Sequence, residues 1–284
     1  MSLYQKKQQH SITSLVHLPW NHANIHRMLR MKLHLITAKR KGIDTYLVTN
    51  TKQENFYRKI FGVKGFHCMH YVYVNENHYQ ILDVEKKYDA VYTAQMAKFK
   101  RMHLAKSIKN LFILTYKIQQ NEGFDLHSFC PDLSHAYYNK AWCGVEEKNR
   151  VYNQSRVGLC LSKEEGPMLA SLEYMLAGIP VVSTKSSGGR DQYYDSEYCI
   201  IVKDTAEAVK NGVKEMMSRS IDPLHIRAKT LMKLDKERDR YIDFVGDVFK
   251  KKGIGDWDPQ NMKKFLFHNP EKNFLKIKNL HKIL

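Results

Sequence analysis

The sequence predicts an α/β protein in which helices cover parallel β-sheets. Short apolar segments rich in β-branched residues alternate with longer segments of helical periodicity, which is the pattern of βαβ units. The alternation occurs twice, before and after the polar residues 75–87, which contain an Asn-Glu-Asn turn and a run of charges. The 284 residues are enough for two domains of ordinary size. We therefore expect two domains, each with its own sheet.

The alternation of strands and helices before the polar segment predicts a small domain over residues 1–80. Its strands are expected at residues 11–16, 44–49 and 67–74, and its helices at residues 23–40 and 52–61. Gly62 follows the second helix directly, and a glycine at this place commonly ends a helix.

The alternation after the polar segment predicts a second domain with a larger parallel sheet over residues 81–250. Its strands are expected at residues 88–94, 111–116, 157–161, 179–184 and 199–202, and its helices at residues 101–109, 146–155, 167–177, 205–217 and 222–249. Ligands of such sheets bind beyond the carboxyl ends of the strands. Lys100, Glu165 and Gly188 each follow an expected strand, so we expect all three at this edge. The lysine-rich residues 251–284 are expected to form a docking helix or a tail.

Composition excludes several classes of site. The five cysteines are odd in number and lack paired spacing, which argues against a disulfide framework and a zinc site. The 14 histidines form no metal-binding motif. No apolar run approaches the length of a membrane span, and the N-terminus lacks the apolar core of a signal peptide. We expect an intracellular protein with reduced cysteines and no metal.

The most informative segment places two carboxylates eight residues apart, at Glu165 and Glu173. Pro167 suits a first helical turn and Gly178 marks the helix end, so Glu165 is expected in a loop and Glu173 roughly 10–12 Å further along the helix. That span suits a sugar nucleotide. Unpaired backbone N–H groups at the helix start offer donors to an anionic or polyhydroxylated ligand, here those of Gly166, Met168 and Leu169.

Several pieces in a fixed order resemble a known family. They are a linker at residues 73–80, the strand and basic loop Ala90-Val-Tyr-Thr-Ala-Gln-Met-Ala-Lys-Phe-Lys-Arg, a helix at residues 144–155, the two spaced glutamates, and Ser186-Ser-Gly-Gly-Arg. Together they resemble the carboxyl-terminal domain of retaining GT-B glycosyltransferases of the family-4 type, glycosyl transferases group 1. The resemblance covers roughly residues 35–250. It implies an α/β fold of two Rossmann-like domains of GT-B type, the first one truncated, because only about 80 residues precede the linker.

The resemblance implies sugar transfer from a nucleoside diphosphate sugar to an acceptor with retention at the anomeric carbon. Such enzymes neutralise the leaving diphosphate with side-chain cations and helix dipoles, so the resemblance implies no metal and no cofactor. It also assigns roles to residues. Glu165 would hold the hydroxyls of the donor sugar as a catalytic residue, and Glu173 the ribose. Further donor-binding positions are Lys100, Arg101, Gly166, Pro167, Met168, Leu169, Gly188, Gly189 and Arg190.

Three of these assignments have plain alternatives. Lys100 and Arg101 match the basic loop that meets the diphosphate, or form a solvated helix start. His17 is the candidate for a catalytic histidine that the first domain supplies, or an ordinary histidine at a strand end. Arg190 would meet an acceptor or donor phosphate, or lie in a surface loop.

The charge of the chain favours anionic partners. The net charge is +17, and its excess lies mostly before residue 86 and after residue 249. A solvated lysine-rich surface explains this as well as any one anionic partner. No nucleic-acid-binding motif is present, so we expect no nucleic acid. Basic and apolar residues interleave near the C-terminus, which suggests peripheral attachment of residues 250–284 to a membrane.

The expected function is transfer of a sugar to a glycan, a lipid-linked or another acceptor in surface polysaccharide or glycoconjugate synthesis. The expected location is the cytoplasm, with the inner membrane surface as a further option. The alternative is a non-catalytic nucleotide-sugar-binding module or partner subunit derived from such an enzyme.

Overall fold

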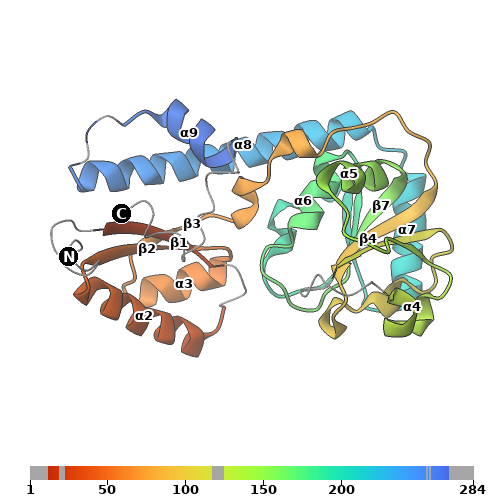
Figure 1. Cartoon of the computed structure of the whole chain (residues 1–284), viewed down its shortest axis with the longest axis horizontal. Coiled ribbons are helices and arrows are strands. Elements are labelled where there is room, and N and C mark those ends of the chain that lie inside the picture. The colour runs from red at the N-terminus through yellow and green to blue at the C-terminus, as the bar shows by residue number, and fades with distance from the viewer. Residues whose placement is uncertain (1–11, 19–22, 117–124, 254, 256, 269–284) are drawn as a thin grey trace. The chain divides into compact units, whose positions relative to one another are not determined.

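The chain divides into two compact units. The computed structural model describes residues 12–18, 23–116, 125–253, 255 and 257–268. The first unit comprises residues 1–75 and 234–284, and the second comprises residues 76–233 (Figure 1). The first boundary lies within a few residues of the expected one. The C-terminal segment differs from the expected division, since residues 234–250 belong to the first unit.

The first unit contains a parallel sheet of three strands in the order β1-β2-β3. The strands are β1 (Ile12–His17), β2 (Ile43–Thr49) and β3 (Gly65–His67). One side of the sheet carries α2 (Ile25–Arg40) and α3 (Lys52–Ile60) (Figure 1). The other side carries the later turns of α8 (Pro223–Lys251) and α9 (Pro259–Phe267).

Alternating residues of β2 supply both cores of this unit. Leu47 packs with Met28 of α2 on one side of the sheet, while Val48 packs with Tyr241 of α8 on the other. Neighbouring residues of a strand point to opposite faces, so a continuous apolar run is what a strand covered on both sides requires. Thr51 begins α3 with a capping box that Glu54 completes.

The strand expected at residues 67–74 is wrong for most of its length. Only Gly65–His67 pair with β2, and residues His70–Tyr73 form a 3₁₀ turn. The amide oxygen of Asn50 accepts the backbone N–H of His70 at 2.9 Å, which satisfies the donor without a sheet partner.

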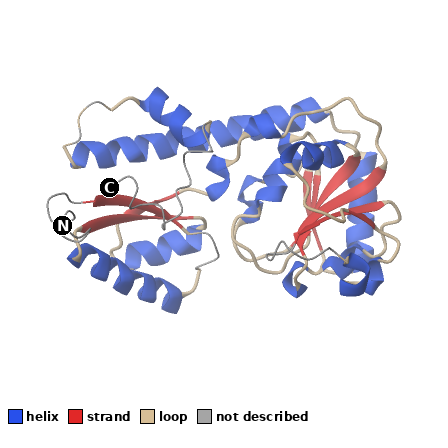
Figure 2. Cartoon of the chain, in the orientation of Figure 1, coloured by secondary structure: helices blue, strands red, loops and turns tan. Residues whose placement is uncertain are grey.

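The second unit contains a parallel sheet of six strands in the order β6-β5-β4-β7-β8-β9. Figure 2 shows strands of this sheet in red with helices packed around them. Its strands are β4 (Tyr88–Gln95), β5 (Leu111–Tyr116), β6 (Tyr137–Tyr138), β7 (Ser155–Cys160), β8 (Val181–Thr184) and β9 (Cys199–Val202). Five of them were expected from the sequence, and the two-residue β6 was not. The chain builds outward from β4 to β6 and then returns to the other side of β4 with β7. The strand order therefore reverses between β4 and β7, where sheets of this kind bind ligands.

The helices of the second unit are α4 (Leu126–Phe129), α5 (Val145–Asn153), α6 (Leu169–Leu176), α7 (Ala206–Ser218) and the first turns of α8. The α-helix expected at residues 101–109 is absent. Two short 3₁₀ turns, Lys98–Lys100 and Met102–Ala105, stand there instead. Arg101 between them is left-handed with φ 50°, which an α-helix does not accommodate.

Two features are absent from the described residues. Among the described helices none is both long and apolar enough to cross a membrane. The same part of the chain contains no group of three His, Cys, Asp or Glu side chains placed to hold a metal ion. Membrane attachment was expected for residues 250–284, of which residues 269–284 lie outside the described residues.

Candidate functional site

The candidate site lies at the carboxyl ends of β4 and β7, where the strand order reverses. The loop after β4 carries Lys100, and the loop after β7 carries Glu165. The two loops are joined by a hydrogen bond from the Lys163 N–H to the Phe99 carbonyl, 3.2 Å long. The hydroxyl of Tyr92 in β4 donates to the carbonyl of Lys100 at 2.7 Å, which fixes the first loop from below.

Lys100 and Glu165 form a buried ion pair. The ammonium of Lys100 contacts Oε1 of Glu165, and both side chains are less than one tenth exposed. Lys100 is therefore not the solvated residue that the alternative interpretation expected. Burial lowers the pKa of the Lys100 ammonium to about 8, and the positive charge of Arg190 acts in the same direction.

Glu165 keeps an acceptor available. Its second oxygen, Oε2, is buried and accepts no hydrogen bond from the described residues. A buried carboxylate oxygen without a donor is costly, and a ligand hydroxyl would remove that cost. The pair thus presents an ammonium and a free carboxylate oxygen at one point of the sheet edge.

A glycine turn sets the position of Glu165. The loop after β8 pairs with the loop after β7, since Glu165 N–H donates to Ser187 O at 3.1 Å and Ser187 N–H donates to Lys163 O at 3.2 Å. Gly188 follows with φ 117°, and a Cβ there would overlap the carbonyl oxygen of Glu165. Only glycine allows this approach. Gly189 is also left-handed and opens the 3₁₀ turn Arg190–Tyr193.

Helix α6 starts two residues later than expected, at Leu169 rather than Pro167. Gly166, Pro167 and Met168 form the loop between Glu165 and the helix. The hydroxyl of Ser171 donates to the carbonyl of Met168 at 2.8 Å and holds this loop against the first turn. The expected sugar-binding backbone is therefore next to Glu165, as part of a loop rather than of a helical turn.

Glu173 lies at the centre of a buried hydrogen-bond network. Its Oε1 accepts from the Tyr79 hydroxyl at 2.8 Å and from the Lys148 ammonium at 3.0 Å. Its Oε2 accepts from the Tyr152 hydroxyl at 2.7 Å. Burial, with the Glu173 charge acting in the same direction, raises the pKa of Tyr79 and Tyr152, so both phenols stay protonated and donate. Glu173 thereby ties residue 79 to α5 and α6.

The three partners of Glu173 were missed in the sequence. Lys148 and Tyr152 lie four residues apart on one face of α5, and this spacing was the one available signal. Tyr79 belongs to the segment expected to be a polar linker, where nothing indicated burial. It is 5% exposed.

Arg101 and Arg190 donate hydrogen bonds to residues at the carboxyl ends of the strands. Arg101 donates to Leu161 O at 2.7 Å and to Thr184 Oγ1 at 2.7 Å, and it also pairs with Asp204. Arg190 is 2% exposed, and its guanidinium donates to the carbonyls of residues Cys160, Ser162 and Thr184. It is not in a surface loop exposed to solvent. Its contact with a phosphate stays a prediction.

A cavity of about 830 Å³ lies along the same edge, lined by sequence neighbours of Lys100 and Glu165 but by neither member of the ion pair. Four cationic side chains line it, those of Lys98, Arg101, Lys163 and Lys185, together with the carboxylates of Glu164 and Asp204. Phe99, Ser186 and Ser187 complete the lining. The excess of positive charge suits a phosphorylated ligand. Its lysines at positions 163 and 185 were not singled out in the sequence.

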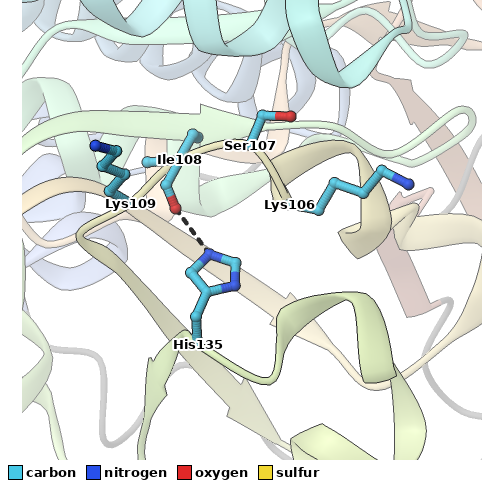
Figure 3. A pocket seen from close by; sticks show the side chains of 5 residues that line it. All are labelled: Lys106, Ser107, Ile108, Lys109 and His135. Carbon is cyan, nitrogen blue, oxygen red and sulfur yellow. Dashed lines mark hydrogen bonds between the residues drawn. The ribbon is translucent and has the colours of Figure 1, made fainter.

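A smaller cavity of about 350 Å³ lies at residues 106–109 and 135, and holds none of the expected residues (Figure 3). Nε2 of His135 lies 2.8 Å from the carbonyl of Ile108, and the amines of Lys106 and Lys109 point to opposite sides, away from the imidazole (Figure 3). Its polar groups do not converge, and it precedes β5 at the amino edge of the sheet.

His17 belongs to the first unit. It ends β1, and its Nε2 lies 3.0 Å from the hydroxyl of Tyr73, which donates in turn to Tyr241. Burial, and next the neighbouring His70, lower the pKa of His17 to about 3, so the imidazole is neutral at neutral pH. Its catalytic role stays a prediction.

Known proteins share the fold of this chain, and a family model matches part of its sequence. Residues 132–219, about a third of the chain, match the family model of glycosyl transferases group 1. No curated protein sequence matches the chain.

Three solved structures share the fold. The chain is similar to sucrose-phosphate synthase from Thermosynechococcus elongatus, with 13% identity, a TM-score of 0.59 and coverage of 89% of this chain and 71% of that one. It is similar to HepE from Anabaena in complex with UDP, with 10% identity, a TM-score of 0.59 and coverage of 78% and 67%. The third is the pneumococcal O-GlcNAc transferase GtfA in complex with UDP and GlcNAc, with 12% identity, a TM-score of 0.56 and coverage of 87% and 54%.

The chain thus spans about half the length of GtfA and about two thirds of the length of the other two. At these identities the likeness shows the fold. The protein has the α/β architecture of GT-B glycosyltransferases, and its residues 132–219 match the model of glycosyl transferases group 1.

Proposed function

We propose that the chain is a retaining glycosyltransferase of the family-4 type that uses a nucleoside diphosphate sugar. One observation carries the proposal. The buried pair of Lys100 and Glu165 presents a cation and a free carboxylate oxygen at the point where the strand order reverses. A glycosyl donor needs these two groups together, because its diphosphate is anionic and its sugar hydroxyls are hydrogen-bond donors.

The proposed chemistry follows from charge development. Cleavage of the bond between the sugar and the diphosphate places negative charge on the leaving oxygen, and a preorganised cation lowers the barrier. Lys100 supplies that cation, and the cavity beside it adds Lys98 and Arg101. Oε2 of Glu165 accepts a sugar hydroxyl. With these cations in place, we propose that the reaction proceeds without a metal or cofactor.

The proposed contact between Glu173 and the ribose uses an acceptor position that its hydrogen-bond network does not occupy. A carboxylate oxygen has two acceptor positions. Oε1 has both taken, by Tyr79 and Lys148, and Oε2 has one taken, by Tyr152. One position on Oε2 is left for a ribose hydroxyl. Glu173 therefore has a structural role in holding Tyr79, Lys148 and Tyr152 together, and a binding role toward the ribose.

The proposed acceptor is a glycan or a lipid-linked molecule, in surface polysaccharide or glycoconjugate synthesis at the cytoplasmic side of the inner membrane. Two of the similar structures are complexes with UDP, which makes uridine nucleotides the first donors to screen. The first unit, whose sheet has three strands, is the proposed acceptor side.

The test separates binding from turnover. In Glu165→Gln, sugar transfer and donor hydrolysis should fall about a hundredfold or more, because the amide replaces the acceptor that orients the sugar. UDP binding, measured by calorimetry, should persist, since Lys100 remains. Glu146→Gln on the exposed start of α5 is the matched control and should keep full turnover.

Two outcomes contradict the proposal. Unchanged turnover in Glu165→Gln would remove Glu165 from the site. Nucleotide-sugar binding by the unaltered protein without hydrolysis or transfer would favour a non-catalytic binding module.

A further inference from the structure

Helix α2 of the first unit has two apolar faces. Met28, Met31 and Leu35 pack against the sheet. Four other apolar side chains, about 120° away around the helix at 100° per residue, are exposed to solvent. They are Ile25, Leu29, Leu33 and Ile36, with exposed fractions of 48%, 44%, 58% and 40%. A surface helix of a globular protein normally has polar residues on that side.

Helix α3 repeats the arrangement beside it. Tyr57 and the following Phe61 pack on the same core as α2, while Phe56 and Ile60 are 58% and 59% exposed. Both helices cover the same side of the sheet (Figure 1). We call the six exposed side chains of Ile25, Leu29, Leu33, Ile36, Phe56 and Ile60 the outer patch. Single exposed apolar residues are common, but six on two adjacent helices indicate a binding surface.

The charge around the outer patch has one sign. Helix α2 contains no acidic residue, and the single acidic residue of α3, Glu54, is buried in its capping box. The exposed cations of the two helices are Arg27, Arg30, Lys39, Arg40, Lys52 and Lys59. On a helical projection, Lys39 and Arg30 fall on opposite flanks of the apolar stripe of α2.

The exposed apolar side chains and the cations around them favour one kind of partner. Apolar side chains at the centre and cations at the margins match the interface of a bilayer with anionic headgroups. A second copy of the chain would bring these cations against each other without acidic partners on either helix. We propose that the outer patch lies on an anionic membrane surface, with its apolar side chains in the headgroup region.

The inference deepens the membrane association in the proposed function by assigning its surface to α2 and α3. It does not depend on sugar transfer, because none of the residues at the candidate site takes part. Its test therefore needs no donor, and a negative donor-hydrolysis result would leave it intact.

The experiment is vesicle co-sedimentation of the full chain. The probes are phosphatidylcholine vesicles with and without about 30% phosphatidylglycerol. The unaltered protein should bind the anionic vesicles, and higher salt should weaken that binding. The double variant Leu29→Gln with Leu33→Gln should bind them at least about tenfold more weakly, and Arg30→Gln with Lys39→Gln should behave similarly.

The matched control removes exposed apolar residues elsewhere. Leu224→Gln with Met232→Gln changes two side chains that are 66% and 72% exposed on α8, and it should bind as the unaltered protein does. Circular dichroism should be the same for all variants, since every changed side chain is exposed.

Three results would overturn the inference. The first is the absence of vesicle binding by the unaltered protein. The second is equal binding by Leu29→Gln with Leu33→Gln, or equal binding to both kinds of vesicle. The third is a dimer in sedimentation velocity that this variant converts to a monomer, which would make a second copy the occupant.

Discussion

Lys100 and Glu165 form an ion pair at the edge of the second sheet. Under the proposed function, a diphosphate that arrives there would compete with the Glu165 carboxylate for the same ammonium. The charge state of Lys100 would then decide how well the site attracts a nucleotide. Burial has moved its pKa to about 8, close to neutral pH.

The affinity for UDP should fall as the pH rises through about 8. Below that pKa the ammonium is charged and attracts the diphosphate, whereas above it the amine is neutral and the attraction is lost. Calorimetric titrations with UDP at pH 7 and about pH 9.5 measure the change, which should reach about tenfold.

The control for this prediction keeps the charge at high pH. Lys100→Arg carries a guanidinium that does not deprotonate in this range, so its UDP affinity should be nearly independent of pH. An equal pH dependence in the unaltered protein and in this variant would show that another group titrates.

The site residues were predictable to different degrees. Lys100, Glu165 and Gly188 each follow a strand, so the sequence was sufficient to expect them at one edge, where Lys100 and Gly188 both contact Glu165. The partners of Glu173 come from a linker and from α5, and only the tertiary packing brings Tyr79 to Tyr152. Arg190 has the same sequence signal as a phosphate ligand, yet its donors are directed to strand carbonyls.

At the level of elements, the loops after β7 and β8 act as one piece. They are paired by backbone hydrogen bonds, and Gly188 lies against the carbonyl of Glu165. The position of the carboxylate thus depends on a residue in the next loop along the sheet. A side chain at position 188 has no space and an unfavourable φ of 117°.

Gly188→Ala should destabilise the second unit by about 2 kcal/mol or more and displace Glu165. Urea unfolding and donor hydrolysis should both reveal the change. Gly144→Ala is the matched control, because a Cβ there meets nothing within 4 Å and its φ is −67°. Comparable stability of the two variants would mean that the paired loops adapt more easily than their contacts indicate.

The elements that the sequence predicted well are the ones in which apolar residues recur with a clear helical or strand period. All five longer strands of the second sheet appear, as do α5, α7 and α8. The failures have local causes. Residues 101–109 have helical composition, but the left-handed Arg101 divides them into short turns. Residues 68–74 are apolar like a strand, but Asn50 satisfies the backbone of His70 from the side.

At the scale of the molecule, the first unit is held together by a cluster drawn from distant parts of the chain. His17 comes from β1, His70 and Tyr73 from the 3₁₀ turn that follows β3, and Tyr241 from α8. Protonation of His17 would bury a charge within this cluster. The unit should therefore be sensitive to acid.

The first unit should lose stability as the pH falls below about 6.5. His17 has a pKa of about 3 when folded and about 6.5 when unfolded, so the unfolded chain binds more protons between these values and stability decreases toward pH 3. The loss from this residue should be about 3 kcal/mol at about pH 4.5. Urea unfolding at that pH and at about pH 7.5 measures it.

His17→Asn should remove this part of the pH dependence, while His103→Asn, at an exposed position of the second unit, should leave it unchanged. If both variants retained the full acid sensitivity, the cluster around Tyr73 would not be its source.

The division of the first unit between residues 1–75 and 234–284 has a consequence for synthesis on the ribosome. Strands β1 to β3 leave the exit tunnel first, but among the described residues one face of their sheet is covered by α8 and α9, which are translated last. The second unit lies wholly between these segments and has all its strands before either arrives. During translation, the second unit can therefore complete its fold before the first, while Val48, Cys68 and Val72 wait for their packing partners from α8 and α9.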